Sequence, residues 1–135
     1  MLDNRQERRS SMFINYSNHP SIKWQREQAL AAEEMGGEIL DVPFPSVPVT
    51  YSDKDILALA YEEADRITSL CPKNAVVMCQ GEFTLCYAVV SILQNRDIQV
   101  VSATTERKTV ERIEDGTVIK TAEFHFAGFR EYCRV

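Results

Sequence analysis

The segment Ala75–Cys79 (AVVMC) is the feature that most constrains the fold of this chain. All of its residues are apolar, so a strand formed there would be buried on both faces. Such strands occupy the centre of parallel sheets, which need helical crossovers to cover them. The rest of the chain must therefore supply helices and further strands in alternation.

The neighbouring segments supply that alternation. Further strands are predicted for Met12–Tyr16, Glu38–Val42 and Ile98–Ala103, and helices for residues 21–35, 52–70 and 83–94. The helix at 52–70 has the clearest apolar periodicity, and Ser52 with Asp55 is spaced like a capping box. After residue 108 the pattern changes to alternation, and Asp115-Gly116 predicts a β-hairpin between Thr109 and Phe126.

Together these elements predict an α/β fold of the Rossmann-like type. Right-handed crossovers give a mainly parallel sheet in the order 2-1-3-4, flanked by helices and followed by the C-terminal hairpin. Residues 12–135 are expected to form one domain, and residues 1–11 a polar N-terminal tail.

Charge and composition exclude several classes of function. The net charge of −5 and the pI near 5.1 disfavour long nucleic acids as partners, because binding their backbone normally requires a basic face. No apolar run approaches the roughly 20 residues of a membrane span, and no secretory signal is present, so we expect a cytoplasmic protein. The four cysteines lack metal-ligand spacing, and Cys79 and Cys86 resemble small buried apolar residues. We expect no metal, and the absence of G-x-G-x-x-G and of a Walker lysine argues against a dinucleotide cofactor.

The predicted strand order nominates a site. In the order 2-1-3-4 the chain reverses direction between strands one and three, and ligands bind at the carboxyl ends of those strands. The two loops there contain Ser17, Asn18, His19 and Ser21, and then Gln80, Gly81, Glu82 and Thr84. Thr104, Thr105 and Arg107 leave the fourth predicted strand on the same side. Backbone amides, hydroxyls, side-chain amides and an imidazole suit a sugar-phosphate ligand.

Structural interpretations stand beside the functional ones. His19 precedes Pro20 and is also placed to cap the first helix. Gly81 suits either a sharp turn or the close approach of a ligand to the backbone. Trp24 either packs in the core or stacks on a base. Glu82 suits a helix N-terminus and would repel a phosphate there.

The predicted helix 83–94 is apolar nearly all round, with Phe83, Tyr87 and Val90 among the candidates for an outer face. Exposed apolar surface of that extent usually marks an interface, so we expect a two-fold homodimer through this helix.

Three short phrases resemble small stand-alone proteins of the CARF (CRISPR-associated Rossmann fold) group. They are residues 15–21 (NYSNHPS) followed by Trp24, residues 80–84 (QGEFT) and residues 103–107 (ATTER). Members of that group bind cyclic oligoadenylate second messengers of type III CRISPR antiviral signalling, and some, the ring nucleases, cleave them. The resemblance implies a ligand-binding role for Ser17, Asn18, Gln80, Gly81 and Thr84, with His19 and Arg107 in catalysis.

The cleavage that the resemblance implies needs no metal, because a ribose 2′-hydroxyl attacks the adjacent phosphate. Two alternatives remain open at this point. One is a non-catalytic nucleotide-binding or protein-interaction module of the same fold, and the other is a nucleoside-processing enzyme with Glu82 or Glu106 as nucleophile.

Overall fold

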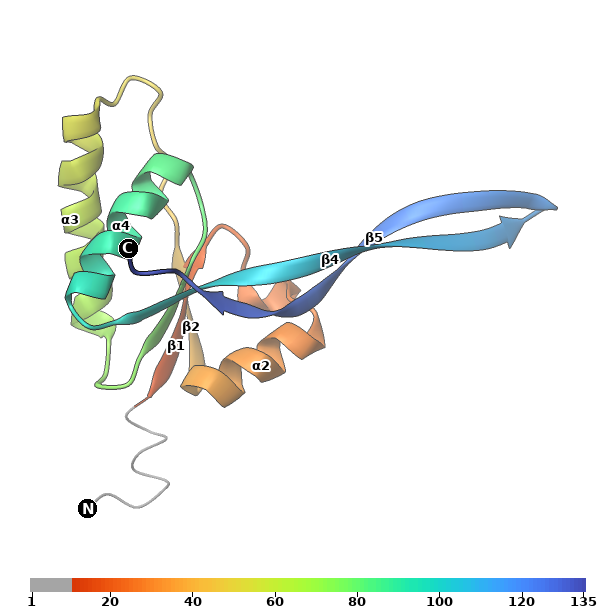
Figure 1. The fold of residues 1–135 in the computed structure, drawn as a ribbon, viewed down its shortest axis with the longest axis horizontal. Helices are drawn as coiled ribbons and strands as arrows, with labels where there is room; N and C mark the ends of the chain where they lie inside the picture. Colours follow the sequence, from red (N-terminus) through yellow and green to blue (C-terminus); the bar gives the residue numbers. More distant parts are fainter. Residues whose placement is uncertain (1–10) are drawn as a thin grey trace, which may run out of the picture.

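The structure, a computed structural model, describes residues 11–135 (Figure 1). Residues 1–10 of the predicted polar tail lie outside the described part. The elements in chain order are β1 (Met12–Ser17), the 3-10 helix η1 (Ser21–Lys23), α2 (Arg26–Gly36), β2 (Glu38–Pro43), α3 (Asp53–Leu70), β3 (Val76–Cys79), α4 (Phe83–Asn95), β4 (Gln99–Glu114) and β5 (Thr117–Glu131).

The sheet has the order β2-β1-β3-β4-β5. The first four strands in this order are parallel neighbours, and β5 pairs antiparallel to β4. The all-apolar β3 lies between β1 and β4, with every residue buried. The predicted α/β class, the strand order 2-1-3-4 and the C-terminal hairpin are therefore confirmed.

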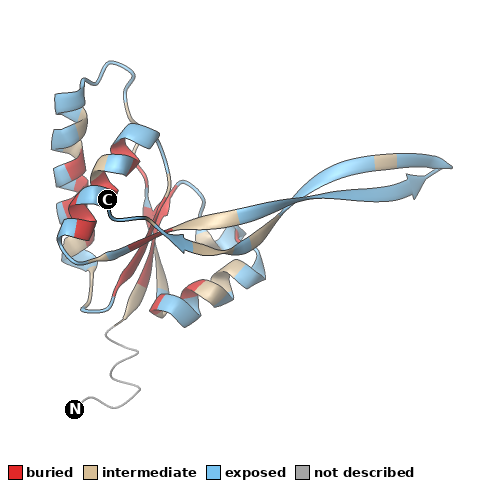
Figure 2. Ribbon diagram, viewed as in Figure 1, coloured by how far each residue is buried: buried red, intermediate tan, exposed pale blue. Residues whose placement is uncertain are grey.

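Helices cover both faces of the sheet, α3 and α4 on one side and α2 on the other (Figure 1). Alternation along β1 divides the core between these layers: Ile14 and Tyr16 pack with α3 and α4, whereas Phe13 packs on the α2 side. The buried residues concentrate in the central strands and in the inner faces of α3 and α4 (Figure 2). The loops that form the site therefore begin at the ends of buried, well-packed strands.

The N-terminus of α3 confirms the predicted capping box. Ser52 Oγ accepts a hydrogen bond from the Asp55 backbone N–H at 3.2 Å, and the Asp55 carboxylate accepts one from Ser52 N–H at 3.0 Å. These reciprocal bonds satisfy backbone donors that the first helical turn would otherwise leave unpaired.

The prediction of a helix over residues 21–35 is wrong for residues 21–25, which precede α2. The chain forms only the short η1, is then extended at Trp24 and Gln25, and begins α2 at Arg26. The extended residues have tertiary partners: Trp24 packs edge-on against Phe13, and the Gln25 side chain binds the backbone of β5. Packing and side-chain hydrogen bonds thus outweigh the local helical preference.

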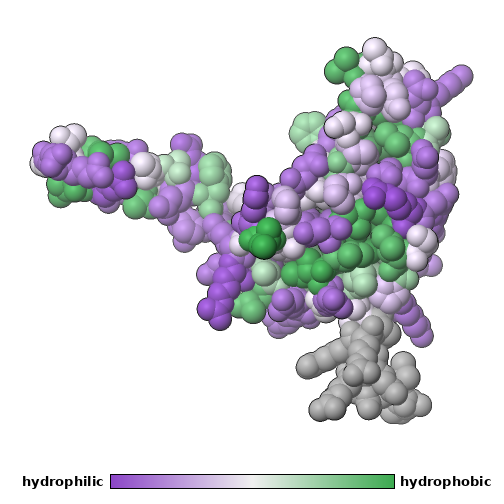
Figure 3. Space-filling view, turned by 180° about the vertical axis from the view of Figure 1, so that it is seen from behind, coloured by the Kyte–Doolittle hydropathy of each residue, from purple (hydrophilic) through white to green (hydrophobic). Residues whose placement is uncertain are grey.

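The predicted fourth strand and the predicted hairpin are continuous. The strands β4 and β5 form one long two-stranded ribbon over residues 99–131. β4 passes from the sheet through residues 104–108 without a break, with a β-bulge between Thr104 and Thr105, and pairs with β5 from Val101 to Glu114. Asp115 and Gly116 have positive φ angles of 50° and 75°, as the predicted two-residue turn requires. The outer ribbon projects from the body, with apolar and polar side chains interspersed along it (Figures 1 and 3).

No helix within residues 11–135 is long and apolar enough to cross a membrane.

Candidate functional site

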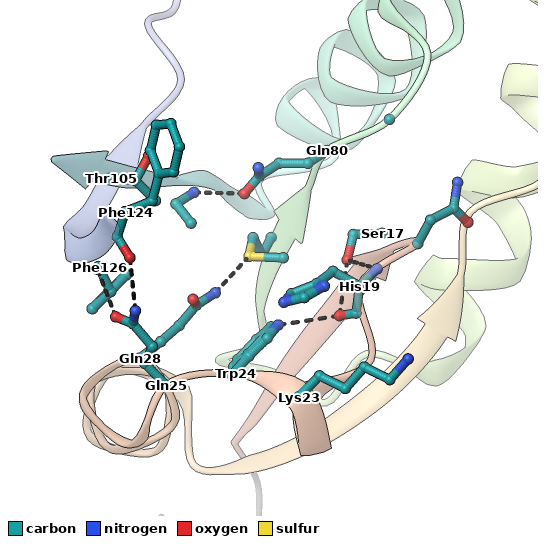
Figure 4. A pocket seen from close by; sticks show the side chains of 14 residues that line it. Ser17, His19, Lys23, Trp24, Gln25, Gln28, Gln80, Thr105, Phe124 and Phe126 are labelled. Atoms are coloured by element: carbon teal, nitrogen blue, oxygen red, sulfur yellow. Dashed lines mark hydrogen bonds between the residues drawn. The ribbon is translucent and has the colours of Figure 1, made fainter. Parts of the chain in front are cut away.

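A pocket of about 630 Å³ opens where β1, β3 and β4 approach the base of the ribbon (Figure 4). Its volume lies in the range of about 300–1,000 Å³ typical of small-molecule sites. The lining residues are Ser17, Asn18, His19, Lys23, Trp24, Gln25, Gln28, Met78, Gln80, Gly81, Ala103, Thr105, Phe124 and Phe126. The pocket therefore lies at the carboxyl ends of the parallel strands, at the predicted reversal of chain direction.

The pocket brings together part of the predicted site. Seven predicted residues line it: Ser17, Asn18, His19, Trp24, Gln80, Gly81 and Thr105. Five others do not line it: Ser21, Glu82, Thr84, Thr104 and Arg107. The five lie elsewhere: Ser21 at the loop anchor, Glu82 and Thr84 in the α4 cap, and Thr104 and Arg107 on β4.

The loop after β1 is held through the backbone of His19. Its carbonyl oxygen accepts hydrogen bonds from Asn15 Nδ2 at 2.9 Å and from Trp24 Nε1 at 3.1 Å. Its backbone N–H donates to Ser17 Oγ at 3.2 Å. The imidazole has no hydrogen-bond partner among the described residues and lies against the pocket (Figure 4). The ring is thereby available to a ligand on a fixed backbone.

The structure corrects the interpretation of His19 as a helix cap. The residue before η1 is Pro20, and neither η1 nor α2 has a side-chain cap, so His19 does not cap a helix. Because α2 begins at Arg26, the amino end of that helix and its dipole do not lie at His19 either.

Asn15 is a site residue that the sequence interpretation missed. It is 1% exposed, and besides His19 O its Nδ2 donates to Asp41 Oδ1 at 2.9 Å. Asp41 in turn accepts hydrogen bonds from the backbone N–H and the hydroxyl of Ser21. The sequence signal that could have identified Asn15 is a polar residue inside each of two apolar strands. These two residues, Asn15 and Asp41, are direct neighbours in the β1–β2 register. Ser21 therefore anchors the loop and does not line the pocket.

Two glutamines fix the opposite wall. Gln25 Nε2 donates to Phe124 O at 2.8 Å, and Gln25 Oε1 accepts from Phe126 N–H at 2.8 Å, so one side chain holds β5 at two points (Figure 4). Gln80 Oε1 accepts from Ala103 N–H at 2.7 Å and ties the loop after β3 to β4. The sequence interpretation missed Lys23, Gln25, Gln28, Phe124 and Phe126, because it placed them inside a helix or a hairpin distant from the site.

Gly81 owes its lack of a side chain to packing. A Cβ atom there would lie 2.6 Å from the ring of Phe44, which is buried and packs against Tyr16. A contact that short requires the ring to shift. The protein's own aromatic ring therefore accounts for glycine at this position, without invoking close approach of a ligand to the backbone.

Glu82 and Thr84 cap α4. The Glu82 carboxylate accepts hydrogen bonds from Thr84 N–H at 3.0 Å, Leu85 N–H at 2.8 Å and Thr84 Oγ1 at 2.7 Å. The bond from the Thr84 hydroxyl, followed by the two backbone bonds, lowers the pKa of Glu82 below its ordinary value. This helix end is occupied by the protein's own carboxylate, so it is not an anion site.

Thr104 and Arg107 belong to the ribbon. Thr104 Oγ1 donates to Gly128 O at 2.7 Å across the two strands. Arg107 pairs with Phe124 in the strand register and lies on the same face of β4 as Thr105, beyond the pocket lining. Only a ligand that extends along the ribbon would reach its guanidinium.

The electrostatic character of the pocket differs from that of the whole chain. The chain carries a net charge of −5, yet among residues 11–135 no carboxylate lines the pocket, whose lining includes Lys23 and His19. Its aromatic surface comes from Trp24, Phe124 and Phe126. Amide groups complete the lining. The combination suits a ligand with both a phosphate and a flat ring.

Comparison with known proteins shows that the model of the uncharacterized protein MJ1673 family matches residues 11–130. The chain belongs to this family. The matched region includes the parallel sheet, its helices, the pocket residues and nearly all of the ribbon. No curated protein and no solved structure matches the chain.

Proposed function

We propose that this protein binds cyclic oligoadenylate, a messenger of type III CRISPR antiviral signalling, in the pocket and cleaves it without a metal ion. The observation that carries the proposal is the pocket lining at the carboxyl ends of the parallel strands. Within the described part of the chain, it contains an imidazole without a hydrogen-bond partner, a lysine and aromatic rings, and no carboxylate. The proposal also rests on the resemblance of residues 15–24, 80–84 and 103–107 to the CARF group. The activity belongs in the cytoplasm, where such a messenger acts.

Binding would divide between the two walls of the pocket. Phe124, which is 61% exposed, and Phe126 offer ring faces for adenine, and such stacking contributes about 1–3 kcal/mol per base. On the opposite wall, Lys23 offers a charge to a phosphate. Arg107 would neutralise a phosphate of the cyclic oligoadenylate where the ligand extends past Phe124 along the ribbon.

Cleavage would follow from positioning and proton transfer. The ribose 2′-oxygen attacks the adjacent phosphorus as His19 removes the hydroxyl proton, and the 5′-oxygen of the next nucleotide leaves and takes up a proton. The product is a linear chain with a 2′,3′-cyclic phosphate. Lys23 and, for the extended ring, Arg107 would stabilise negative charge in the transition state. The role of Asn15, Ser17 and Trp24 is to fix the His19 backbone.

The test is incubation of the full chain with cyclic tetra-adenylate and cyclic hexa-adenylate in the presence of a chelator, followed by chromatography. The proposal expects linear products that end in a 2′,3′-cyclic phosphate. Binding without products would support the non-catalytic module instead. Absence of both binding and products would reject the proposed ligand.

One observation favours protein interaction as a second function. Phe83 is 90% exposed and Tyr87 80% exposed, on adjacent turns of α4. Val90, a third candidate for this face, is buried, so the exposed apolar surface is narrower than the sequence indicated. We propose a two-fold homodimer centred on Phe83 and Tyr87.

The positions of Glu82 and Glu106 argue against the nucleoside-processing alternative. The Glu82 carboxylate is committed to the α4 cap, outside the pocket. Glu106 lies on the ribbon, outside the pocket lining, and its register partner is His125.

A further inference from the structure

Two cysteine side chains meet at the junction of β3 and α4. Cys79 is the last residue of β3, Cys86 lies in the first turns of α4, and their sulfur atoms are 3.5 Å apart. Both are free thiols. Their separation in sequence gives no C-x-x-C signal, and the sequence interpretation accordingly treated them as small apolar residues. The contact between the sulfurs is visible only in the fold.

The two thiols differ in access. Cys79 is 0% exposed, whereas Cys86 is 8% exposed and lines a groove of about 750 Å³ between α4 and the C-terminal segment. A small reagent that enters this groove reaches Cys86 before it reaches Cys79. This order is the one expected of an attacking thiol and a resolving thiol.

Polar groups around Cys86 favour its thiolate. The hydrogen bond from the Cys79 thiol is the main cause that lowers the pKa of Cys86 to about 7. The Tyr132 hydroxyl lies 3.7 Å from Cys86 Sγ, but it donates its single proton to Cys79 O at 2.7 Å, so it contributes less. The hydrogen bond from Cys79 to Cys86 in turn raises the pKa of the Cys79 thiol, ahead of the effect of burial.

We propose that Cys86 and Cys79 form a redox-active dithiol site that a hydroperoxide converts to an intramolecular disulfide. The Cys86 thiolate attacks the outer oxygen of the peroxide, the O–O bond breaks, and the leaving alkoxide or hydroxide takes up a proton. This step gives a sulfenic acid on Cys86. The Cys79 sulfur then attacks the Cys86 sulfur, and the sulfenic oxygen leaves as water. Two thiols and one hydroperoxide thus yield one disulfide, one alcohol or water from the peroxide, and one further water.

Disulfide formation requires the two sulfur atoms to move closer together. The sulfurs must close from 3.5 Å to a bond of about 2.05 Å. The disulfide would close the segment that contains Gln80 and Gly81, both of which line the pocket at β3. The dithiol site does not depend on the identity of the pocket's ligand, so it stands or falls separately from the proposed function.

The test uses the full chain, reduced and then treated with stoichiometric hydrogen peroxide. We expect an intact mass reduced by two hydrogen atoms, a Cys79–Cys86 linked peptide after proteolysis, and reversal by dithiothreitol. Cys133 is exposed, so Cys133→Ser serves as the matched control and should still form the link. Oxidation confined to Cys133, with Cys79 and Cys86 fully alkylated after denaturation, would overturn the proposal.

Two variants examine the assigned order. Cys79→Ala should stop at the sulfenic acid, which dimedone traps on Cys86, whereas Cys86→Ala should form neither adduct nor disulfide. The opposite pattern, with dimedone on Cys79, would overturn the assignment. In the proposed homodimer, a second copy docked at Tyr87 would shield the groove that Cys86 lines. Repeating the oxidation in a Tyr87→Glu background removes that shielding. Failure to form the disulfide there as well would reject the dithiol chemistry.

Discussion

The carbonyl oxygen of His19 accepts a 2.9 Å hydrogen bond from the side chain of Asn15, a buried residue of β1. The bond fixes the backbone of the loop and leaves the imidazole unpaired among the described residues. The site is thus built in two layers. One layer of side chains is fully hydrogen-bonded and positions the loop, and the other faces the pocket with polar groups available to a ligand.

The first prediction concerns Asn15. Asn15→Ala removes the hydrogen bonds that the buried Asn15 side chain donates to His19 O and Asp41, which should reduce the free energy of unfolding by about 1–3 kcal/mol. Urea denaturation measures this loss. Asn18→Ala is the matched control, because Asn18 is exposed and lines the pocket without anchoring the loop. Equal stability of the two variants would refute the anchoring role.

The fold could be predicted from the sequence where single segments determine the outcome. The apolar β3 placed the sheet centre, and Asp115-Gly116 placed the ribbon turn. The errors arose where distant residues decide. Trp24 is extended because Phe13 packs against it and because its indole binds His19 O. No local pattern contains that information.

The candidate site followed the same division. The predicted strand order placed the Ser17–His19 loop and the Gln80–Gly81 loop at one edge of the sheet, and both line the pocket. The contribution of Phe124 and Phe126 depends on how the ribbon returns past α2, where Gln25 holds it. That contact joins residues nearly a hundred positions apart, beyond the reach of sequence periodicity.

The second prediction concerns Gly81. Gly81→Ala places a methyl group 2.6 Å from the Phe44 ring, which is buried against Tyr16. We expect a loss of about 1–3 kcal/mol in the free energy of unfolding, as for other overpacked sites. The double variant Gly81→Ala with Phe44→Leu should lose less than the sum of the single losses, because the smaller side chain leaves room. Additive losses in thermal or urea unfolding would disprove the packing explanation.

The third prediction concerns pH. Because the pKa of Glu82 is lowered in the folded state, its carboxylate stabilises the protein at pH values above the unfolded pKa near 4.5. That contribution is lost as the pH falls through the lower folded value. Glu82→Gln should therefore be less stable than the wild type at neutral pH, with a difference that shrinks in acid. Denaturation measured across this pH range provides the test, and a difference independent of pH would contradict it.

The fourth prediction concerns assembly through α4. Tyr87→Glu places a charge at the centre of the proposed two-fold contact and should halve the mass measured by light scattering at micromolar concentration. Tyr61→Glu is the matched control, because Tyr61 is also exposed but lies on α3. The control should keep the wild-type mass. A wild-type protein that is monomeric at the outset would count decisively against the dimer.

The last prediction concerns the imidazole of His19. The ring neither caps a helix nor bonds to a described residue, so His19→Ala should leave the free energy of unfolding nearly unchanged. If the ring accepts the ribose proton, the same variant should slow single-turnover cleavage of cyclic oligoadenylate by roughly 10²-fold or more, with ligand affinity largely kept. Lys23→Ala is the complementary variant, since losing a phosphate contact should weaken binding as well as cleavage. Binding titrations and single-turnover rates on both variants separate the two roles. An unchanged rate in folded His19→Ala would remove the imidazole from the mechanism and leave cleavage to positioning by the pocket and to charge from Lys23 and Arg107.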